Sequence, residues 1–121
     1  MFTGIVKGLG FVVRCEPYGS GRTIWIQQDV CANVQIGDSL SINGVCSTVV
    51  ESKSNWYRFD YLEESLTKTH LGDIQEGDKV NVEDALSLHD KFGGHIVTGH
   101  VDSVGSLYKV ERDDPWHVIW V

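Results

Sequence analysis

Side chains able to do acid–base chemistry gather in residues 93–102 of this 121-residue chain. This ten-residue stretch holds His95, Thr98, His100 and Asp102 together with three glycines. An imidazole titrates near neutral pH, so either histidine is a candidate proton donor or acceptor. The two histidines are five positions apart and would face opposite ways on a regular strand, so a shared metal ion is not expected. The stretch is a candidate site for proton transfer, whereas a lone histidine is more often structural.

A second candidate set lies in residues 45–50, whose pattern predicts a strand. Because side chains alternate between the two faces of a strand, Cys46 and Thr48 share one face and could touch the same ligand. The alternative interpretation is structural, with Cys46 as a small buried hydrophobic residue and Thr48 as a β-former. The pattern alone favours this structural interpretation.

A third set consists of Asp60, Glu63, Glu64 and Ser65, which follow a predicted strand and open the one convincing helical segment, residues 62–71. Acidic residues in a first helical turn usually cap the helix and complement its dipole. Their functional alternative is to hold a polyhydroxylated ligand, together with exposed backbone N–H groups.

An internal repeat begins inside the 93–102 stretch. Residues 98–101 read Thr-Gly-His-Val, and residues 3–6 read Thr-Gly-Ile-Val, 95 positions earlier. The same offset holds to the last residues, where residues 119–121 correspond to residues 24–26. A match at both ends of such a window indicates one duplicated domain rather than a solenoid of short units.

The repeat predicts how the chain is divided. We expect residues 1–95 to form one complete unit and residues 96–121 to be the opening strands of a second, truncated unit. The last residues continue an apolar strand without a turn or cap, so we expect the natural chain to extend further. His100 replaces Ile5 of the first unit, and a titratable residue in place of an aliphatic one suggests specialisation for chemistry.

The remaining patterns predict an all-β unit with one or two short helices. The tightest hairpin signal is Asn43-Gly44. Six short strands are best arranged as a closed or nearly closed barrel, because closure hides their edges. The predicted strands are residues 2–15, bent at glycines, then 23–28, 39–42, 45–50, 56–61 and the strand that ends at residue 82.

The composition narrows the class of partner. A net charge of −7 argues against nucleic acid or an anionic membrane as the main partner, because both select clustered lysine and arginine. No apolar run is long enough to span a bilayer, and the first residues do not form a signal peptide. Three cysteines without CxxC spacing indicate reduced thiols rather than disulfides or a zinc site. We therefore expect a cytoplasmic protein.

Several longer motifs together resemble the α-chain type of riboflavin synthase, and the resemblance spans essentially the whole chain. The resemblance implies two similar six-stranded Greek-key barrels and a C-terminal helix, usually in a homotrimer. It also implies that each active site forms where the first barrel of one subunit faces the second barrel of another. The matching motifs are residues 1–6, 43–49, 59–60, 64–66, 69–72, 77–83 and 93–102.

The reaction implied by the resemblance is a transferase reaction. Two molecules of 6,7-dimethyl-8-ribityllumazine dismutate to riboflavin and 5-amino-6-ribitylamino-pyrimidinedione, without a metal or an organic cofactor. The resemblance assigns proton transfer to His100 and a polar or nucleophilic contact to Cys46. The substrate-binding residues that it implies are Phe2, Gly4, Ile5, Val6, Cys46, Ser47, Thr48, Asp60, Tyr61, Leu62, Glu63, Glu64, Ser65, Gly99, His100 and Val101.

Two other functions compete with the enzyme. The first is a non-catalytic lumazine- or flavin-binding protein of the same superfamily, and the second is a generic small barrel for protein interaction. Such binding proteins tend to lose the histidine and the cysteine-containing motif, so the presence of Cys46 and His100 favours the enzyme. His70, where the family often has asparagine, is a minor departure.

Overall fold

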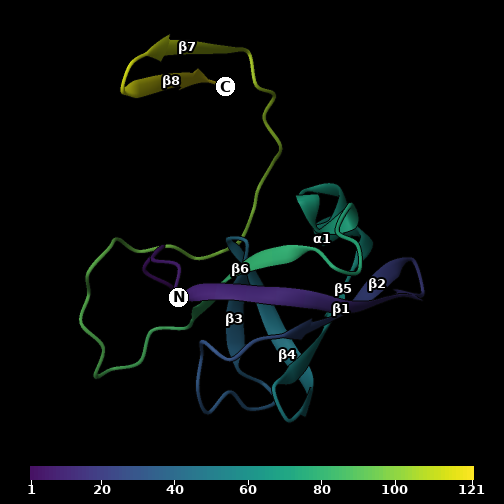
Figure 1. Cartoon of the computed structure of the whole chain (residues 1–121). Coiled ribbons are helices and arrows are strands. Elements are labelled where there is room, and N and C mark those ends of the chain that lie inside the picture. Colours follow the sequence, from purple (N-terminus) through teal and green to yellow (C-terminus); the bar gives the residue numbers. More distant parts are fainter.

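The computed structural model describes residues 1–121 and contains a closed antiparallel barrel followed by a separate hairpin (Figure 1). The barrel strands are β1 (Gly8–Tyr18), β2 (Gly21–Gln27), β3 (Ser39–Ile42), β4 (Val45–Lys53), β5 (Trp56–Tyr61) and β6 (Lys79–Asp84). Strands β3, β4 and β5 are consecutive neighbours, β5 lies beside β2, and β6 returns beside β3. This order is a Greek key, so the predicted six-stranded all-β barrel is confirmed.

The barrel closes where its first and last strands pair. Residues 8–11 of β1 lie opposite residues 79–82 of β6, from the pair Gly8 and Val82 to the pair Phe11 and Lys79. The register shifts once in β1, between Val12 and Arg14, and once in β4. Such bulges bend a strand and increase its twist, which helps six strands to close.

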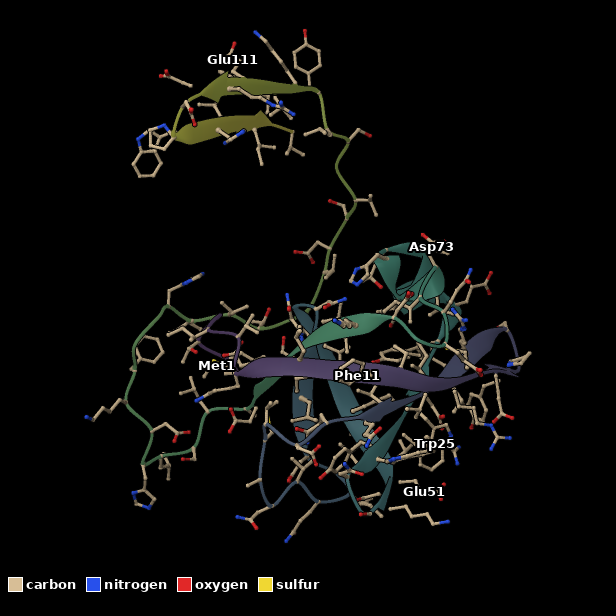
Figure 2. All side chains as sticks on the ribbon, in the orientation of Figure 1. Met1, Phe11, Trp25, Glu51, Asp73 and Glu111 are labelled. Atoms are coloured by element: carbon tan, nitrogen blue, oxygen red, sulfur yellow. The ribbon has the colours of Figure 1, made fainter.

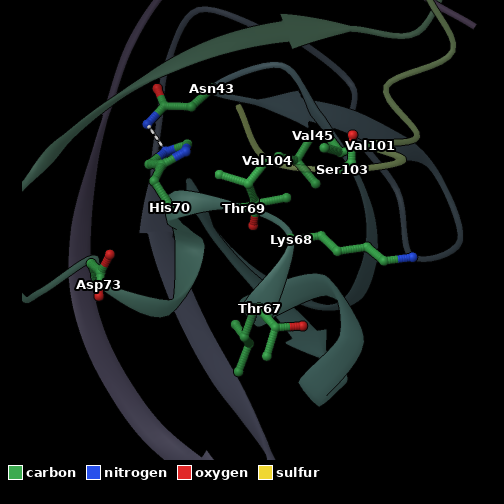
Figure 3. A pocket seen from close by; sticks show the side chains of 11 residues that line it. Asn43, Val45, Thr67, Lys68, Thr69, His70, Asp73, Val101, Ser103 and Val104 are labelled. Atoms are coloured by element: carbon green, nitrogen blue, oxygen red, sulfur yellow. Dashed lines mark hydrogen bonds between the residues drawn. The ribbon is translucent and has the colours of Figure 1, made fainter. Parts of the chain in front are cut away.

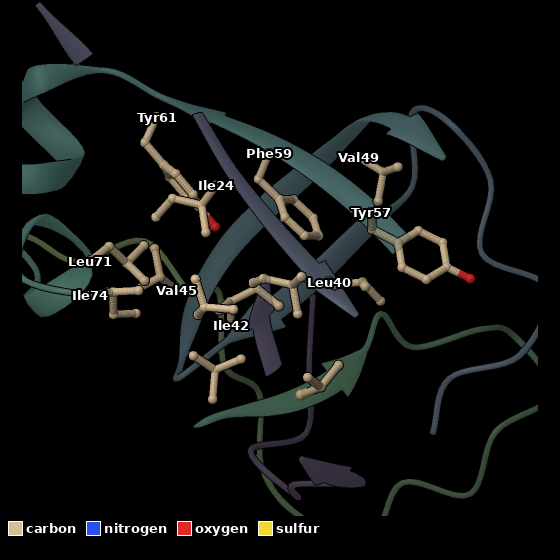
Figure 4. Close-up of a cluster of buried hydrophobic side chains, with 14 of the residues drawn as sticks. Ile24, Leu40, Ile42, Val45, Val49, Tyr57, Phe59, Tyr61, Leu71 and Ile74 are labelled. Atoms are coloured by element: carbon tan, nitrogen blue, oxygen red, sulfur yellow. The ribbon is translucent and has the colours of Figure 1, made fainter. Parts of the chain in front are cut away.

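The core fills the inside of the barrel (Figure 4). On β4, Val45, Ser47 and Val49 are buried, whereas Cys46 is half-buried and Thr48 is exposed. The predicted alternation is therefore present, with Cys46 and Thr48 on the outer face. The largest fully buried side chains are Phe2, Phe59, Ile24, Ile26, Leu40, Ile42, Leu71, Val12, Val49, Val80 and Val82.

The expected strand over residues 2–15 is wrong at its start, because β1 begins only at Gly8. Residues 1–7, here called the N-terminal arm, form one isolated β-bridge, between Phe2 and Val97. Gly4 interrupts the extended conformation with a φ of 81°. The 93–102 stretch likewise contains no strand beyond that bridge, although its apolar pattern allows one.

The predicted helix over residues 62–71 is broken into two pieces. Helix α1 spans Glu63–Thr67, and the 3₁₀ helix η1 spans His70–Gly72. Thr69 separates them because its backbone is extended, with φ −141° and ψ 161°. Its hydroxyl donates to the Ser65 carbonyl at 2.6 Å and accepts from the Leu71 N–H at 3.3 Å, so it caps both pieces. No helix of the structure is long and apolar enough to cross a membrane.

The C-terminal hairpin of β7 (Lys109–Asp113) and β8 (Trp116–Trp120) stands away from the barrel, with exposed side chains on both faces (Figures 1 and 2). Its first strand pair joins Lys109 to Trp120. In the barrel, Arg14 pairs with Trp25, which are the same two positions 95 residues earlier. All five pairs of the hairpin follow this rule, so β7 and β8 share the register of β1 and β2.

The burial of the core predicts that two phenylalanines contribute very differently to the free energy of unfolding. Phe59 is 1% exposed, and Phe59→Ala should lower the free energy of unfolding by about 3–5 kcal/mol through lost burial and a residual cavity. Phe11 is 46% exposed on the outer face of β1, so Phe11→Ala is the matched control and should cost about 1 kcal/mol or less. Urea denaturation of both variants measures the difference. Equal losses would contradict the inward placement of Phe59.

Candidate functional site

The predicted chemical residues meet on the outside of the barrel, where the 93–102 stretch crosses β4. The Cys46 N–H donates a hydrogen bond to the Gly99 carbonyl at 2.8 Å. Gly99 is buried and has a φ of 76°, and a Cβ placed on it would lie 2.8 Å from the Cys46 nitrogen. Only glycine fits both the left-handed backbone and this close approach. The contact brings His100, the next residue, to the neighbourhood of Cys46.

A cavity of about 200 Å³ lies at this crossing. Its lining includes six of the predicted site residues, namely Cys46, Glu64, Ser65, Gly99, His100 and Val101. Three further lining residues, Val45, Lys68 and Thr69, are absent from the sequence-based prediction. Lys68 had a usable signal, since it lies one helical turn after Glu64 and pairs with it at 2.7 Å. No comparable signal pointed to Val45, which is buried.

A larger cavity of about 610 Å³ adjoins the first and shares Val45, Lys68, Thr69 and Val101 with it (Figure 3). Helix α1 and η1 form one wall, and residues 101–104 form the other. A nitrogen of the Asn43 amide lies 2.7 Å from His70 Nε2 across this cavity's rim. His70 therefore links η1 to the turn between β3 and β4. Together the two cavities offer space on the scale of a small-molecule site.

The N-terminal arm repeats the local geometry of the 98–101 segment. The Ile5 N–H donates to the Thr3 hydroxyl at 3.2 Å, and the His100 N–H donates to the Thr98 hydroxyl at 3.2 Å. The glycine inside each turn, Gly4 or Gly99, has a left-handed φ. The sequence repeat is thus also a repeat of backbone conformation.

The arm residues do not line the cavity beside Cys46. Phe2 is fully buried and pairs with Val97 through N–H···O bonds of 2.8 and 3.1 Å. Gly4 and Val6 line a separate hollow of about 80 Å³, while Ile5 is exposed. The arm therefore flanks the candidate site and supports its 98–101 wall.

Asp60 is held by other protein groups. Arg58 donates to both carboxylate oxygens, at 3.1 and 2.9 Å, and the Thr23 hydroxyl donates at 2.6 Å. Burial raises the pKa of Asp60, but the hydrogen bonds from Arg58 and Thr23 outweigh it, and the net effect is a lowered pKa. Asp60 is therefore a fixed anion on the outer face of β5, with its acceptor sites already engaged.

The other predicted residues fall into two groups. Ser47 and Tyr61 point into the core, where the Tyr61 hydroxyl donates to Ser47 Oγ at 2.7 Å, and burial raises the pKa of Tyr61. Their side chains are thus turned away from the outer cavity. Thr48, Leu62 and Glu63 are exposed and do not line the two cavities at α1.

The arrangement suits acid–base chemistry on a small organic ligand. His100 brings an exposed imidazole, and Cys46 brings a half-buried thiol, to one open cavity. No group of three or more His, Cys, Asp or Glu side chains is placed to hold a metal ion. The fold and site together define a Greek-key barrel with a small-molecule pocket on its outer face.

Comparison with known proteins places this class in a family. The family model described as the lumazine binding domain matches residues 3–85, which is more than half of the chain. The chain belongs to the lumazine-binding domain family.

The similar full-length proteins are riboflavin synthases. The chain is 36% identical to the riboflavin synthase of Actinobacillus pleuropneumoniae over 122 residues, covering 98% of this chain and 57% of that protein. It is 35% identical to the riboflavin synthase of Escherichia coli, covering 99% of this chain and 57% of that protein. The chain thus spans little more than half the length of these relatives.

Solved structures share the fold. LumP complexed with 6,7-dimethyl-8-(1'-D-ribityl) lumazine is 22% identical, with a TM-score of 0.80 over 98% of this chain and 67% of that chain. LumP complexed with riboflavin is 23% identical, with a TM-score of 0.78 over 94% of this chain and 62% of that chain. At these identities the similarity concerns the architecture alone.

The crossing of Gly99 over Cys46 can be tested with two glycines. Gly99→Ala should speed amide exchange at Cys46 for two reasons. The new methyl group would clash with the Cys46 backbone, and alanine would be strained at this positive φ. Gly77→Ala is the matched control, since Gly77 has a φ of 93° and open space around it. This variant should lose only about 1–2 kcal/mol of stability through backbone strain, without a clash. Amide exchange followed by NMR measures both. Unchanged exchange at Cys46 in Gly99→Ala would contradict the described contact.

Proposed function

We propose that this chain carries the first lumazine-binding barrel of a riboflavin synthase. The observation that supports it most directly is the convergence of Cys46 and His100 on one cavity, from segments more than 50 residues apart in the sequence. The similarity to riboflavin synthases over nearly the whole chain supports the same activity. The reaction would be the dismutation of two 6,7-dimethyl-8-ribityllumazine molecules to riboflavin and 5-amino-6-ribitylamino-pyrimidinedione.

The proposed chemistry needs positioning and proton transfer. The 7-methyl group of the substrate is acidic through conjugation, so a base near neutral pH can remove its proton. His100 would move that proton, and Cys46 would contact the heterocycle. Glu64 and Ser65 border the same cavity and would meet the ligand's polar groups. The remaining barrier is lowered by holding two rings in a reactive orientation.

A non-catalytic binding protein is the second candidate, because the LumP structures are described with lumazine, riboflavin and flavin mononucleotide. The identity to LumP is 22–23%, against 34–37% for the riboflavin synthases. Retention of both Cys46 and His100 also favours the enzyme. A binding protein would need neither residue for proton transfer.

The proposed assembly extends beyond one barrel. We infer that residues 1–95 are the first lumazine-binding barrel and that residues 96–121 open a second one. The shared register of β7–β8 and β1–β2 supports this division. We further propose a homo-oligomer, trimeric in the full-length form, in the cytoplasm. The three free cysteines are compatible with that reducing compartment.

A shortened chain tests the proposed division. A chain ending at Ser103 should keep the urea midpoint of the barrel within about 0.5 M, because the hairpin stands apart from the barrel in the structure. The chain of 121 residues is the reference. A large loss of stability would mean that β7 and β8 belong to the first unit.

Incubation with 6,7-dimethyl-8-ribityllumazine tests the proposed function. Binding should change the ligand's fluorescence, and turnover should produce riboflavin absorbance. Because the chain holds only one complete barrel, binding without turnover would place the missing chemistry in the second barrel, and it would favour the binding protein only if a full-length form is inactive as well. No binding would contradict both candidates. Where turnover occurs, His100→Ala should lower it by about 10²–10⁴-fold with a smaller effect on affinity. His89→Ala, at an exposed position outside both cavities, is the control and should change neither quantity.

A further inference from the structure

Three outward-facing residues form a row across neighbouring strands of the barrel. Ser41 of β3 lies directly opposite Glu83 of β6 on one side and opposite Cys46 of β4 on the other. Residues directly opposite each other project to the same face, so this row runs from Glu83 to Cys46 over two strand spacings, about 10 Å. Glu83 and Ser41 are 4% and 5% exposed although they lie on the outer face. Other segments of the chain must therefore cover the row.

The N-terminal arm covers the Glu83 end. Glu83 Oε1 accepts three hydrogen bonds, from the Thr3 N–H at 2.7 Å, the Thr3 hydroxyl at 2.8 Å and the Gly4 N–H at 3.1 Å. The Thr3 hydroxyl in turn accepts from the Ile5 N–H. One carboxylate oxygen thereby sets the conformation of the whole Thr3-Gly4-Ile5 turn. A buried carboxylate with three donors is a strong, charge-assisted anchor.

The 98–101 segment covers the Cys46 end and is tied to the arm. The Thr3 carbonyl accepts from the His95 N–H at 3.1 Å, and Phe2 pairs with Val97 in both directions. Two residues after that pair, Gly99 reaches Cys46. The arm and the 98–101 segment therefore form one layer over the row. The arm is held by Glu83 and by two backbone hydrogen bonds of 2.9 Å, from Lys7 N–H to the Val82 carbonyl and from Leu86 N–H to the Met1 carbonyl, whereas a single backbone hydrogen bond ties Gly99 to Cys46.

We propose that Glu83 is a positioning residue for the site: by anchoring the Thr3-Gly4 turn, it holds the 98–101 segment on Cys46 and so places His100. The inference rests on the proposed function, since the site that it orders is the lumazine site described above. Glu83 itself touches neither cavity at α1 and acts through Thr3. Glu83 lies more than 15 residues before His100 in the sequence, so the sequence pattern does not indicate that Glu83 positions His100.

Variants of both partners test the anchor. Glu83→Ala removes the acceptor, and Thr3→Val removes the hydroxyl while keeping the side-chain volume. Each should speed amide exchange at Cys46 by about tenfold relative to the core amide of Phe59, which reports global unfolding. Each should also weaken 6,7-dimethyl-8-ribityllumazine binding by about tenfold. Glu83→Gln and Thr3→Ser keep an acceptor and a hydroxyl, so they should recover part of both losses.

Glu76→Ala is the matched control. Glu76 also accepts a backbone hydrogen bond from another segment, the Cys15 N–H at 3.1 Å, but it lies away from the arm. This variant should leave exchange at Cys46 and ligand affinity unchanged.

The two readouts separate the two claims. Unchanged exchange at Cys46 in folded Glu83→Ala or Thr3→Val would overturn the positioning role, whatever the ligand does. Absence of lumazine binding by the unaltered chain would contradict the proposed function, while faster exchange at Cys46 would still support the anchor. If Glu83→Ala does not fold, Thr3→Val and Glu83→Gln decide the outcome by the same measurement.

Discussion

The pairing of β1 with β6 is the constraint on which the rest of the molecule depends. It closes the sheet, so that no strand edge is left open and every inward position is enclosed. The inside is filled by a cluster of mainly apolar side chains packed as in other protein interiors. Cys46 and Asp60 lie on the outer face instead. Closure also brings the start of β1, and with it the N-terminal arm, beside Glu83 of β6.

The candidate site is built from pieces that contribute little alone. Strand β4 supplies Cys46, helix α1 supplies Glu64 and Ser65, and the 98–101 segment supplies His100. At Cys46 the strand pairs with β3 on one side, and on the other side its N–H bonds to Gly99 rather than to β5. The other wall depends on glycine at position 99, which allows one backbone to lie directly on another.

The repeat connects sequence, conformation and chemistry. The arm and the 98–101 segment share a hydroxyl-capped turn with a left-handed glycine, and the two hairpins share one register. The same turn presents an aliphatic residue at Ile5 and an imidazole at His100. The same backbone turn therefore occurs twice, once in the N-terminal arm beside the barrel and once at the candidate site. Over the four residues of this turn, the copies differ only in Ile5 and His100.

The sequence by itself determined the barrel strands from β2 to β6, the Asn43-Gly44 turn and the shared face of Cys46 and Thr48. These features follow from local alternation and turn chemistry, which are written in neighbouring residues. Only the tertiary structure decided that the arm is not a strand, that Thr69 splits the helix, and that Lys68 joins the cavity. It also decided that Ser47 and Tyr61 turn inward and that Glu83 meets Thr3, 80 positions away. Contacts of this kind depend on how the closed barrel brings distant segments together, which no local pattern records.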